Sequence, residues 1–291
     1  MGDLTIESLY EQVRAAVPTA GAEASATPVQ VAPGIRMLAL RTPTLPPAAH
    51  TNVYLVGPHV GPVAVVDPGS PYPEQQALLD AVLADLPVAA VLLTHHHGDH
   101  IGGAAALAAR WNVPICAHAA TARRLDGILE VTQLIADGET VHGMTAVHTP
   151  GHAEGHLCFE LGAATIAGDM VAGLGTILID PSEGDMTLYL ASLELLLARP
   201  AATLLPAHGP AIPDGPAKLR EYLVHRRMRE DRVLRSLSAE PQAIAAMLPA
   251  AYGDTPQMLW PLAERSLLAH LDKLAREGRA QSDGSGRWSR L

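Results

Sequence analysis

The segment 95–100 concentrates groups that bind metal ions: it reads His-His-His-Gly-Asp-His. Imidazole nitrogens and carboxylate oxygens together suit Zn²⁺, with Mn²⁺ and Fe²⁺ as less favoured occupants. The preceding run, 88–94, is apolar, follows Pro87 and has the length of a buried parallel strand. Ligands of open α/β sheets bind at the carboxyl ends of the strands. The sequence therefore predicts a metal site where this strand ends.

Three further turns each offer one metal-binding group directly after a short β run. These groups are His152, Asp169 and His208, and a glycine in each turn lets the backbone approach closely. Together with the first segment they complete a set of candidate metal ligands: His95, His97, Asp99, His100, His152, Asp169 and His208.

The order of these motifs, His-x-His-x-Asp-His followed by Gly-His, Gly-Asp and His-Gly, resembles the metallo-beta-lactamase superfamily of binuclear hydrolases. The resemblance covers roughly residues 28–237. It implies one ligand set for each of two divalent ions: His95, His97 and His152 for the first, and Asp99, His100 and His208 for the second. It also implies that Asp169 bridges the ions and that Asp67 supports the histidine loop through hydrogen bonds.

The chemistry implied is hydrolysis by a metal-bound hydroxide. Two adjacent dications need anionic compensation, which Asp99, Asp169 and a bridging hydroxide would supply. Coordination lowers the pKa of water from about 15.7 toward about 7, and the ions also polarise the bond that is cleaved. Asp99 is the candidate catalytic residue, because it could take or return a proton while it remains a ligand. No serine or cysteine nucleophile is needed.

The elements around these turns indicate an α/β (α+β) fold. Short β runs between 29 and 66 are followed by alternating helix and strand to about 109, and 144–205 repeats this pattern. Two such halves, each a sheet with helices on one face, would pack as a four-layer αββα sandwich. We expect three parts: an N-terminal helical extension and linker (1–27), a catalytic domain (28–237) and a small winged-helix-like domain (238–291).

The last part has helical spacing at 241–248 and 259–277, followed by two short strands within 279–291. Helix, helix and hairpin is the pattern of a winged helix-turn-helix. Segments 51–56, 222–226 and 268–291 resemble the beta-lactamase-like-protein family with a C-terminal winged helix. That family includes a mitochondrial single-strand endoribonuclease, thioesterases of polyketide pathways and bacterial hydrolases. The positive and negative charges on 259–277 nearly cancel. This favours a domain that covers the active site as a lid, rather than a DNA-binding domain.

The composition of the chain limits the classes of partner that we expect for this protein. The net charge is −10, concentrated before residue 217, and this disfavours a polyanionic substrate. Cys116 and Cys158 lie in apolar runs and are expected to be buried and reduced. No apolar run has transmembrane length and the N-terminus lacks a basic-then-apolar leader, so we expect a cytoplasmic protein with no membrane partner.

The favoured function is metal-dependent hydrolysis of a small thioester, ester or lactone, with a small-molecule acyl substrate as partner. One alternative is a metal-dependent endoribonuclease on single-stranded RNA, and another is a DNA-binding regulator that uses the winged helix. The sequence leaves both RNA binding and the formation of a homo-oligomer open. An iron dioxygenase of the same fold is disfavoured, because His100 and His208 complete a second metal site.

Two residues are candidate substrate contacts. Thr176 follows Asp169 on a glycine-rich loop, where a plain loop position is the favoured alternative. His225 lies on the basic segment 215–237, where a surface histidine is equally supported.

Other basic side chains are expected to be structural. His96, His148 and His156 should make packing or hydrogen-bond contacts rather than bind metal. The arginines of 215–237 alternate with acidic residues, which indicates a solvated helix face rather than a phosphate patch. They are Arg226, Arg227, Arg229, Arg232 and Arg235.

Overall fold

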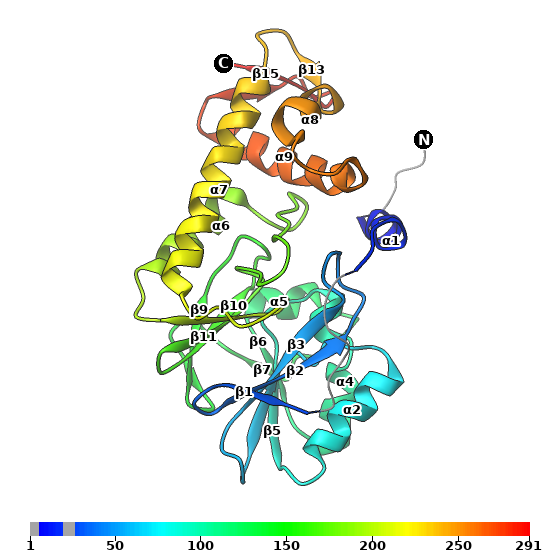
Figure 1. The fold of residues 1–291 in the computed structure, drawn as a ribbon, viewed down its shortest axis with the longest axis vertical. Coiled ribbons are helices and arrows are strands. Elements are labelled where there is room, and N and C mark those ends of the chain that lie inside the picture. Colours follow the sequence, from blue (N-terminus) through cyan, green and yellow to red (C-terminus); the bar gives the residue numbers. More distant parts are fainter. Residues whose placement is uncertain (1–5, 20–26) are drawn as a thin grey trace.

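Two sheets form the larger part of the molecule (Figure 1), in a computed structural model that describes residues 6–19 and 27–291. The first sheet has the order β1-β2-β3-β4-β5-β6-β7 and the second β12-β11-β10-β9-β8. The strands of the first are β1 (Val29–Ala32), β2 (Ile35–Arg41), β3 (His50–Val56), β4 (Val63–Val66), β5 (Val88–Leu92), β6 (Ile115–Ala117) and β7 (Gln133–Leu134). Those of the second are β8 (Thr140–Val141), β9 (Met144–His148), β10 (Leu157–Leu161), β11 (Ala164–Gly168) and β12 (Thr203–Pro206).

Helices flank both sheets (Figure 1). They are α1 (Ile6–Ala16), α2 (Pro73–Leu83), α3 (Gly98–Ile101), α4 (Ala104–Trp111), α5 (Ala119–Arg124), α6 (Met186–Leu197) and α7 (Gly215–Ser236). The chain then forms β13 (Gln242–Ala243), α8 (Ile244–Tyr252), a short 3₁₀ helix η1 (Gln257–Leu259), α9 (Trp260–Arg276), β14 (Ala280–Ser282) and β15 (Arg287–Arg290).

The alternation of side chains along β4 builds the predicted four layers. Ala64 and Val66 join the core between the sheets, whereas Val63 and Val65 join the core under α2 and α4. On the other side, α6 and α7 cover the outer face of the second sheet. The αββα sandwich is therefore confirmed, and both cysteines are buried and free, as expected.

The turns that carry the candidate ligands follow strands whose carboxyl ends lie at one edge of the sheets. β5 pairs in parallel with β4 and β6, as its apolar sequence predicts, and β11 pairs in parallel with β12. Parallel strands place their carboxyl ends at the same edge, so the loops that follow β4, β5, β11 and β12 lie together.

The C-terminal part has the expected winged-helix arrangement, with a small sheet in the order β13-β15-β14. Its own core includes Leu267 and Trp288. One expectation was wrong in detail: 241–248 is not a single helix. Gln242 pairs with Trp288 across β13 and β15, so the helix α8 starts only at Ile244. The first of the expected β runs, from residue 29 to 40, forms two strands, because a turn at Gly34, with φ of 75°, divides it.

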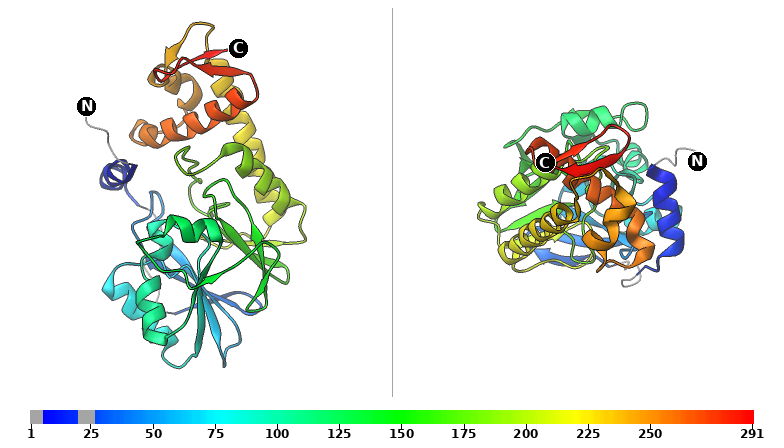
Figure 2. Two further views of the ribbon diagram at one scale, coloured as in Figure 1. Left: turned by 180° about the vertical axis from the view of Figure 1, so that it is seen from behind. Right: turned by 90° about the horizontal axis from the view of Figure 1, so that it is seen from above.

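Helix α7 joins the two parts, as the left view of Figure 2 shows. It packs on α6 near its start and on α8 and α9 near its end. The expectation of a solvated arginine face is therefore wrong for Arg226 and Arg229, which are 3% and 5% exposed. Both lie on the covered side of the helix, with Val233 one turn further on. Arg227, on the other side, is exposed.

Helix α1 lies apart from the sheets, beside η1 of the winged helix (Figure 1). The expected linker at 19–26 falls almost entirely outside the described residues. In the part of the chain that is described, no helix combines the length and the apolar character needed to cross a membrane.

A partly buried carboxylate, that of Glu230, contacts the winged helix, and its charge gives a pH prediction. Glu230 on α7 binds Lys273 Nζ at 2.8 Å and Arg279 Nη1 at 3.3 Å. Burial raises the pKa of Glu230, but the neighbouring His270 and Lys273 outweigh burial and lower it to about 2. Because this value lies below the ordinary 4.5, the ionised carboxylate stabilises the fold above about pH 4.5, and that stabilisation is lost as the pH falls toward 2.

We therefore expect Glu230→Gln to lower the free energy of unfolding by about 2 to 3 kcal/mol at pH 7. Urea unfolding of both proteins between pH 7 and pH 3 measures the difference, which should shrink below about pH 4.5. Glu240→Gln, at an exposed position, is the matched control and should change little. A Glu230→Gln difference that is constant with pH would contradict this role.

Candidate metal centre

Three imidazole nitrogens meet at one point after β5 and β9. His97 Nδ1 lies 2.8 Å from His95 Nε2 and 3.0 Å from His152 Nε2, and the two Nε2 atoms are 3.3 Å apart. Asp169 Oδ2 completes the group at 3.4 Å from His152 Nε2. Nitrogen lone pairs and a carboxylate oxygen that converge in this way can hold a tetrahedral metal ion.

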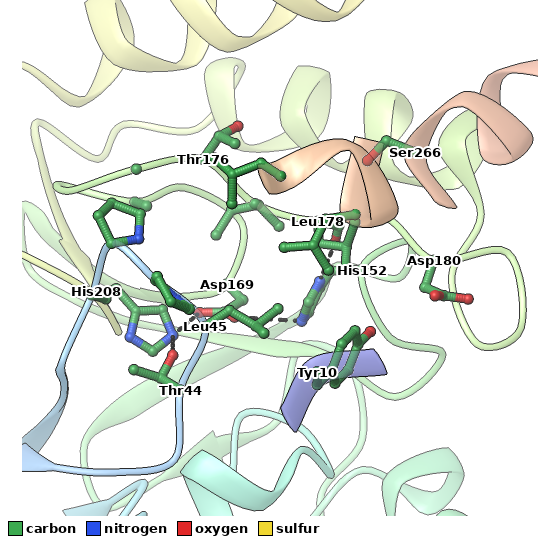
Figure 3. Close-up of a pocket in the computed structure, with 18 of the residues that line it drawn as sticks. Tyr10, Thr44, Leu45, His152, Asp169, Thr176, Leu178, Asp180, His208 and Ser266 are labelled. Atoms are coloured by element: carbon green, nitrogen blue, oxygen red, sulfur yellow. Dashed lines mark hydrogen bonds and ion pairs between the residues drawn. The ribbon is translucent and has the colours of Figure 1, made fainter. Parts of the chain in front are cut away.

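A second group lies next to the first and shares Asp169 with it. Asp169 Oδ1 is 3.3 Å from His208 Nε2 and 3.7 Å from His100 Nε2. Asp99 Oδ2 is 3.5 Å from His208 Nε2 and 3.9 Å from His100 Nε2. All the candidate ligands therefore lie together, and Asp169 presents one oxygen to each group (Figure 3).

Two buried atoms in this centre fit a cation. His100 Nε2 and Asp169 Oδ1 have no hydrogen-bond partner among the described residues. A buried polar atom without a partner is unfavourable unless something else satisfies it, and a metal ion bound by these atoms would do so. The donor set of imidazole nitrogen and carboxylate oxygen also matches the preference of divalent transition ions.

The second ring nitrogen of each candidate histidine is held in place. The partners are Thr94 Oγ1 for His95 (3.0 Å), Glu183 Oε1 for His97 (2.8 Å), Asp67 Oδ2 for His100 (2.8 Å), the Leu178 carbonyl for His152 (2.9 Å) and the His50 carbonyl for His208 (3.0 Å). Such contacts fix the orientation and tautomer of a ring that binds metal. The centre is thus organised by the protein around it.

Asp67, directly after β4, makes hydrogen bonds to the histidine loop. It accepts hydrogen bonds from the Thr94 amide at 2.8 Å and the Thr94 hydroxyl at 2.6 Å, in addition to the His100 contact. Its φ of 51° is in the left-handed region, where few non-glycine residues lie. This strained turn brings the carboxylate to Thr94 and His100.

The turn after Asp67 touches the backbone of α3. A Cβ on Gly69 would lie 1.8 Å from the Asp99 carbonyl oxygen. We expect Gly69→Ala to destabilise the protein by about 3 kcal/mol or more, because neither backbone can move freely. Thermal unfolding measures this, with Gly98→Ala as the matched control, since nothing lies within 4 Å of a Cβ there. Equal melting temperatures for the two variants would refute the close approach.

His156 positions Asp169 rather than joining the ligands. Its Nε2 accepts a hydrogen bond from the Asp169 amide at 3.1 Å, and its Nδ1 lies 2.8 Å from Thr149 Oγ1. His148 lies outside the centre, where its ring stacks on His118 with centroids 4.1 Å apart. Both observations agree with the structural roles expected for these residues.

The pKa values of the candidate histidines differ from ring to ring. In the first group, burial lowers the pKa of His95 well below its usual value and that of His152 to about 4, so these rings are neutral. Burial also acts against charge on His97, but the hydrogen bond with Glu183 raises the pKa of that ring above its usual value. In the second group, burial acts against charge, but Asp99 and Asp67 raise the pKa of His100 to about 10. Burial likewise opposes ionisation of Asp169, but His208 and His100 hold its pKa well below the usual range. Cations placed here would replace the protons.

Glu183 belongs to this centre, and sequence reasoning missed it. Its carboxylate lies 2.8 Å from His97 Nε2 and 3.0 Å from His96 Nε2. Burial raises its pKa, but the hydrogen bonds with His96 and His97 prevail and the pKa is lowered far below the usual range. His96 thus makes the expected hydrogen-bond contact. Glu183 follows no motif, because it lies in the loop before α6 and reaches the histidines only through the fold.

A cavity of about 520 Å³ opens onto the metal-binding groups. Figure 3 shows Asp169 between His208 and His152 at one side of it. Asp99 and both candidate substrate contacts, Thr176 and His225, also line the cavity.

Three parts of the chain enclose this cavity. Tyr10 comes from α1 and Ser266 from α9, and both point toward it in Figure 3. Arg265 on α9 binds Asp180 at 2.7 and 2.8 Å, which ties the winged helix to the loop before α6. Helix α9 therefore forms part of the cavity wall, which is the position that the lid interpretation gives to the winged helix. No sequence pattern predicts the contribution of α1.

Known structures share this fold. A beta-lactamase domain protein from Burkholderia ambifaria has a TM-score of 0.77 at 23% identity, over 93% of this chain and 97% of its own. A protein solved in a di-iron-bound form has a TM-score of 0.50 at 27% identity, over 65% of this chain and 96% of its own.

Curated relatives carry related names. The lactamase-like protein vrtG of Penicillium aethiopicum is 33% identical over 265 residues, 81% of this chain and 83% of that protein. An atrochrysone carboxyl ACP thioesterase of Aspergillus fumigatus is 36% identical over 200 residues, 64% of this chain but 44% of that protein.

Two family descriptions match the chain directly. Residues 46–208, more than half of the chain, match the metallo-beta-lactamase superfamily, and residues 243–288 match the beta-lactamase associated winged helix domain. The chain is a hydrolase of the metallo-beta-lactamase superfamily, with an associated winged helix domain at its C-terminal side.

Proposed function

We propose that this protein is a binuclear metal-dependent hydrolase of small acyl thioesters, with esters and lactones as related substrates. The observation that carries the proposal is the shared Asp169 carboxylate, whose two oxygens face two separate groups of ligand atoms. His95, His97 and His152 would hold one ion, Asp99, His100 and His208 the other, and Asp169 would bridge them. Zn²⁺ suits these ligands best, with Mn²⁺ and Fe²⁺ as alternatives.

Different groups of the protein would take different parts in the hydrolysis. When bound, the ions would lower the pKa of water toward about 7 and polarise the scissile carbonyl. Asp99 lies at the cavity wall, where its carboxylate could take or return a proton. Asp67, Glu183 and His156 would keep the ligands in place while this happens. The winged helix and α1 would limit access of bulk water to the cavity.

A small acyl substrate is supported by the cavity and by a relative. A volume of about 520 Å³ lies in the range of small-molecule sites. Much of the lining is apolar, including Leu45, Leu174 and Leu262, with a few charged groups among them. One relative is named as a thioesterase that acts on an acyl carrier protein substrate. We propose the same bond type, a thioester, for this chain.

A panel of acyl thioesters, esters and lactones tests the proposal, with each compound assayed before and after treatment with a chelator and after metal is restored. We expect turnover of at least one thioester that is lost with the chelator and regained with Zn²⁺. Failure of every acyl compound to be hydrolysed in a chelator-sensitive way would contradict the proposal. Cleavage of single-stranded RNA that weakens steeply with salt would favour the endoribonuclease instead.

A further inference from the structure

Arg226 is a buried cation without an ion-pair partner. Its side chain is 3% exposed, and no carboxylate among the described residues lies within salt-bridge distance of it. The Nη2 atom donates to the Ile177 carbonyl, while Nε has no acceptor in the described part of the chain. A guanidinium stays charged at any working pH, so burying it without an anion is unfavourable.

Arg229 provides an internal comparison, one turn along the same face of α7. It is 5% exposed, and its Nη atoms bind the Asp254 carboxylate at 2.8 and 3.3 Å. It also donates to the Ala251 carbonyl. Two arginines with similar burial on one helix face therefore differ in their counter-ion: Arg229 has one within the protein, and Arg226 does not.

The cavity offers space for a partner of Arg226. The guanidinium lies over the Tyr189 ring, 5.2 Å from its centroid, and Arg226 itself lines the cavity. The neighbouring His225 and Tyr252 also line it, and neither carries a negative charge at neutral pH. An anion that entered the cavity would meet Arg226 beside donors that can add hydrogen bonds.

Two backbone links place Arg226 close to the metal centre. Ile177 accepts from Arg226, while the next carbonyl, that of Leu178, holds His152 Nδ1 at 2.9 Å. The Tyr189 ring under Arg226 carries a hydroxyl that donates to the Met170 carbonyl at 2.8 Å, directly after Asp169. Because consecutive residues are about 3.8 Å apart, both links end next to groups of the metal centre: Ile177 beside Leu178, and Met170 beside Asp169.

We propose that Arg226 determines substrate specificity by binding an oxyanion of the substrate, set apart by a few atoms from the thioester that is cleaved. The oxyanion would be the free carboxylate of a dicarboxylic acyl group or the phosphate of the thiol carrier. This inference rests on the proposed thioesterase function. It adds to that function a charge requirement that the ligand set alone does not contain.

Four thioesters separate the two sources of the oxyanion. The glutaryl group ends in a carboxylate and the pentanoyl group does not. Each acyl group is attached either to N-acetylcysteamine, which has no phosphate, or to coenzyme A, which carries phosphates. For a carboxylate partner we expect kcat/KM of the metal-loaded protein to favour glutaryl over pentanoyl on both carriers. For a phosphate partner it should favour coenzyme A with both acyl groups. Arg226→Gln should remove that preference, a loss of about 10- to 100-fold in the ratio.

Controls distinguish this role from a loss of folding. Arg226→Lys keeps the charge and should retain part of the preference, and Arg229→Gln should lower kcat/KM of all four substrates by the same factor, because Asp254 already neutralises Arg229. Thermal unfolding shows whether each variant is folded. The inference is overturned if Arg226→Gln is folded and changes the four values equally, or if the wild-type protein has no preference for either anionic group.

A binding measurement keeps the inference separate from the proposed function. If no thioester is hydrolysed, the thioesterase function fails, but calorimetric titration of the metal-loaded protein with glutarate, pentanoate and inorganic phosphate still tests Arg226. We expect glutarate to bind at least about 10-fold more tightly than pentanoate, or phosphate to bind, and Arg226→Gln to abolish this. Pentanoate controls for binding of a single carboxylate at the metal ions. Equal affinities in both proteins would refute the inference.

Discussion

Replacing Asp169 with asparagine is expected to lower kcat for the preferred thioester by at least about 1,000-fold, equivalent to about 4 kcal/mol of lost transition-state stabilisation. The amide keeps the shape of the side chain but removes the negative charge that faces both groups of ligand atoms. The side-chain nitrogen of the asparagine would also point at a cation or at the ring of His208. Steady-state kinetics at saturating metal measures the change.

The matched control is Asp126→Asn, which removes an exposed carboxylate outside the cavity and should leave kcat within about twofold. Metal content should be measured on the same samples. If Asp169→Asn has the same metal content as the wild-type protein and also keeps more than a tenth of its kcat, a bridging role for Asp169 is excluded.

Replacing Asp67 with asparagine is expected to weaken metal binding by about 10- to 100-fold, although Asp67 is not itself a candidate ligand. The carboxylate accepts from His100 Nδ1 at 2.8 Å and twice from Thr94, whose hydroxyl in turn contacts His95 Nδ1 at 3.0 Å. An amide can accept only through its oxygen, so at least one of these donors loses its partner. Both groups of ligands should therefore be affected.

Competition with a chromophoric chelator measures the metal affinity of Asp67→Asn. At saturating metal the variant should regain a large share of its activity, which separates a positioning residue from a catalytic one. Asp126→Asn is again the control. An unchanged metal affinity together with a lost kcat would show that Asp67 acts on the reaction itself and not through the histidines.

The ligand-bearing turns can be found from the sequence because each lies at the end of a strand. An apolar run with a histidine or aspartate beside a glycine at its end is a local pattern, and parallel pairing brings the turns after β5, β11 and β12 to one edge. The turn after β9 reaches the same edge as that after β11 because two successive antiparallel pairings give both strands the same direction. This is why the sequence alone is enough to group His152, Asp169 and His208, far apart in the chain, with the segment 95–100. The four-layer arrangement follows from the same alternation of strands and helices.

Residues that act through tertiary contacts cannot be found in this way. Glu183 lies on a loop without periodicity and meets His97 only because that loop folds back over the centre. Arg226 looks like a solvated helix residue, since the covering of α7 by both the sandwich and the winged helix is not written in its own segment. For the same reason, nothing in the first residues indicates that Tyr10 lines the cavity.

The boundaries of the winged helix show a similar limit. Residues 241–248 have apolar spacing that suits a helix, yet the pairing of Gln242 with Trp288 turns the first of them into a strand. That pairing depends on a segment more than forty residues further along the chain. Long-range pairing of this kind overrides local preference at the ends of elements.

The metal content of the purified protein tests the two-metal centre most directly. Mass spectrometry of the metal-loaded wild-type chain should give two equivalents of divalent ion, and His208→Ala, which removes a ligand from the second group alone, should give one equivalent with a large loss of thioesterase activity. A wild-type protein that is fully active with a single equivalent, and whose metal content and activity are unchanged in His208→Ala, would contradict the binuclear mechanism.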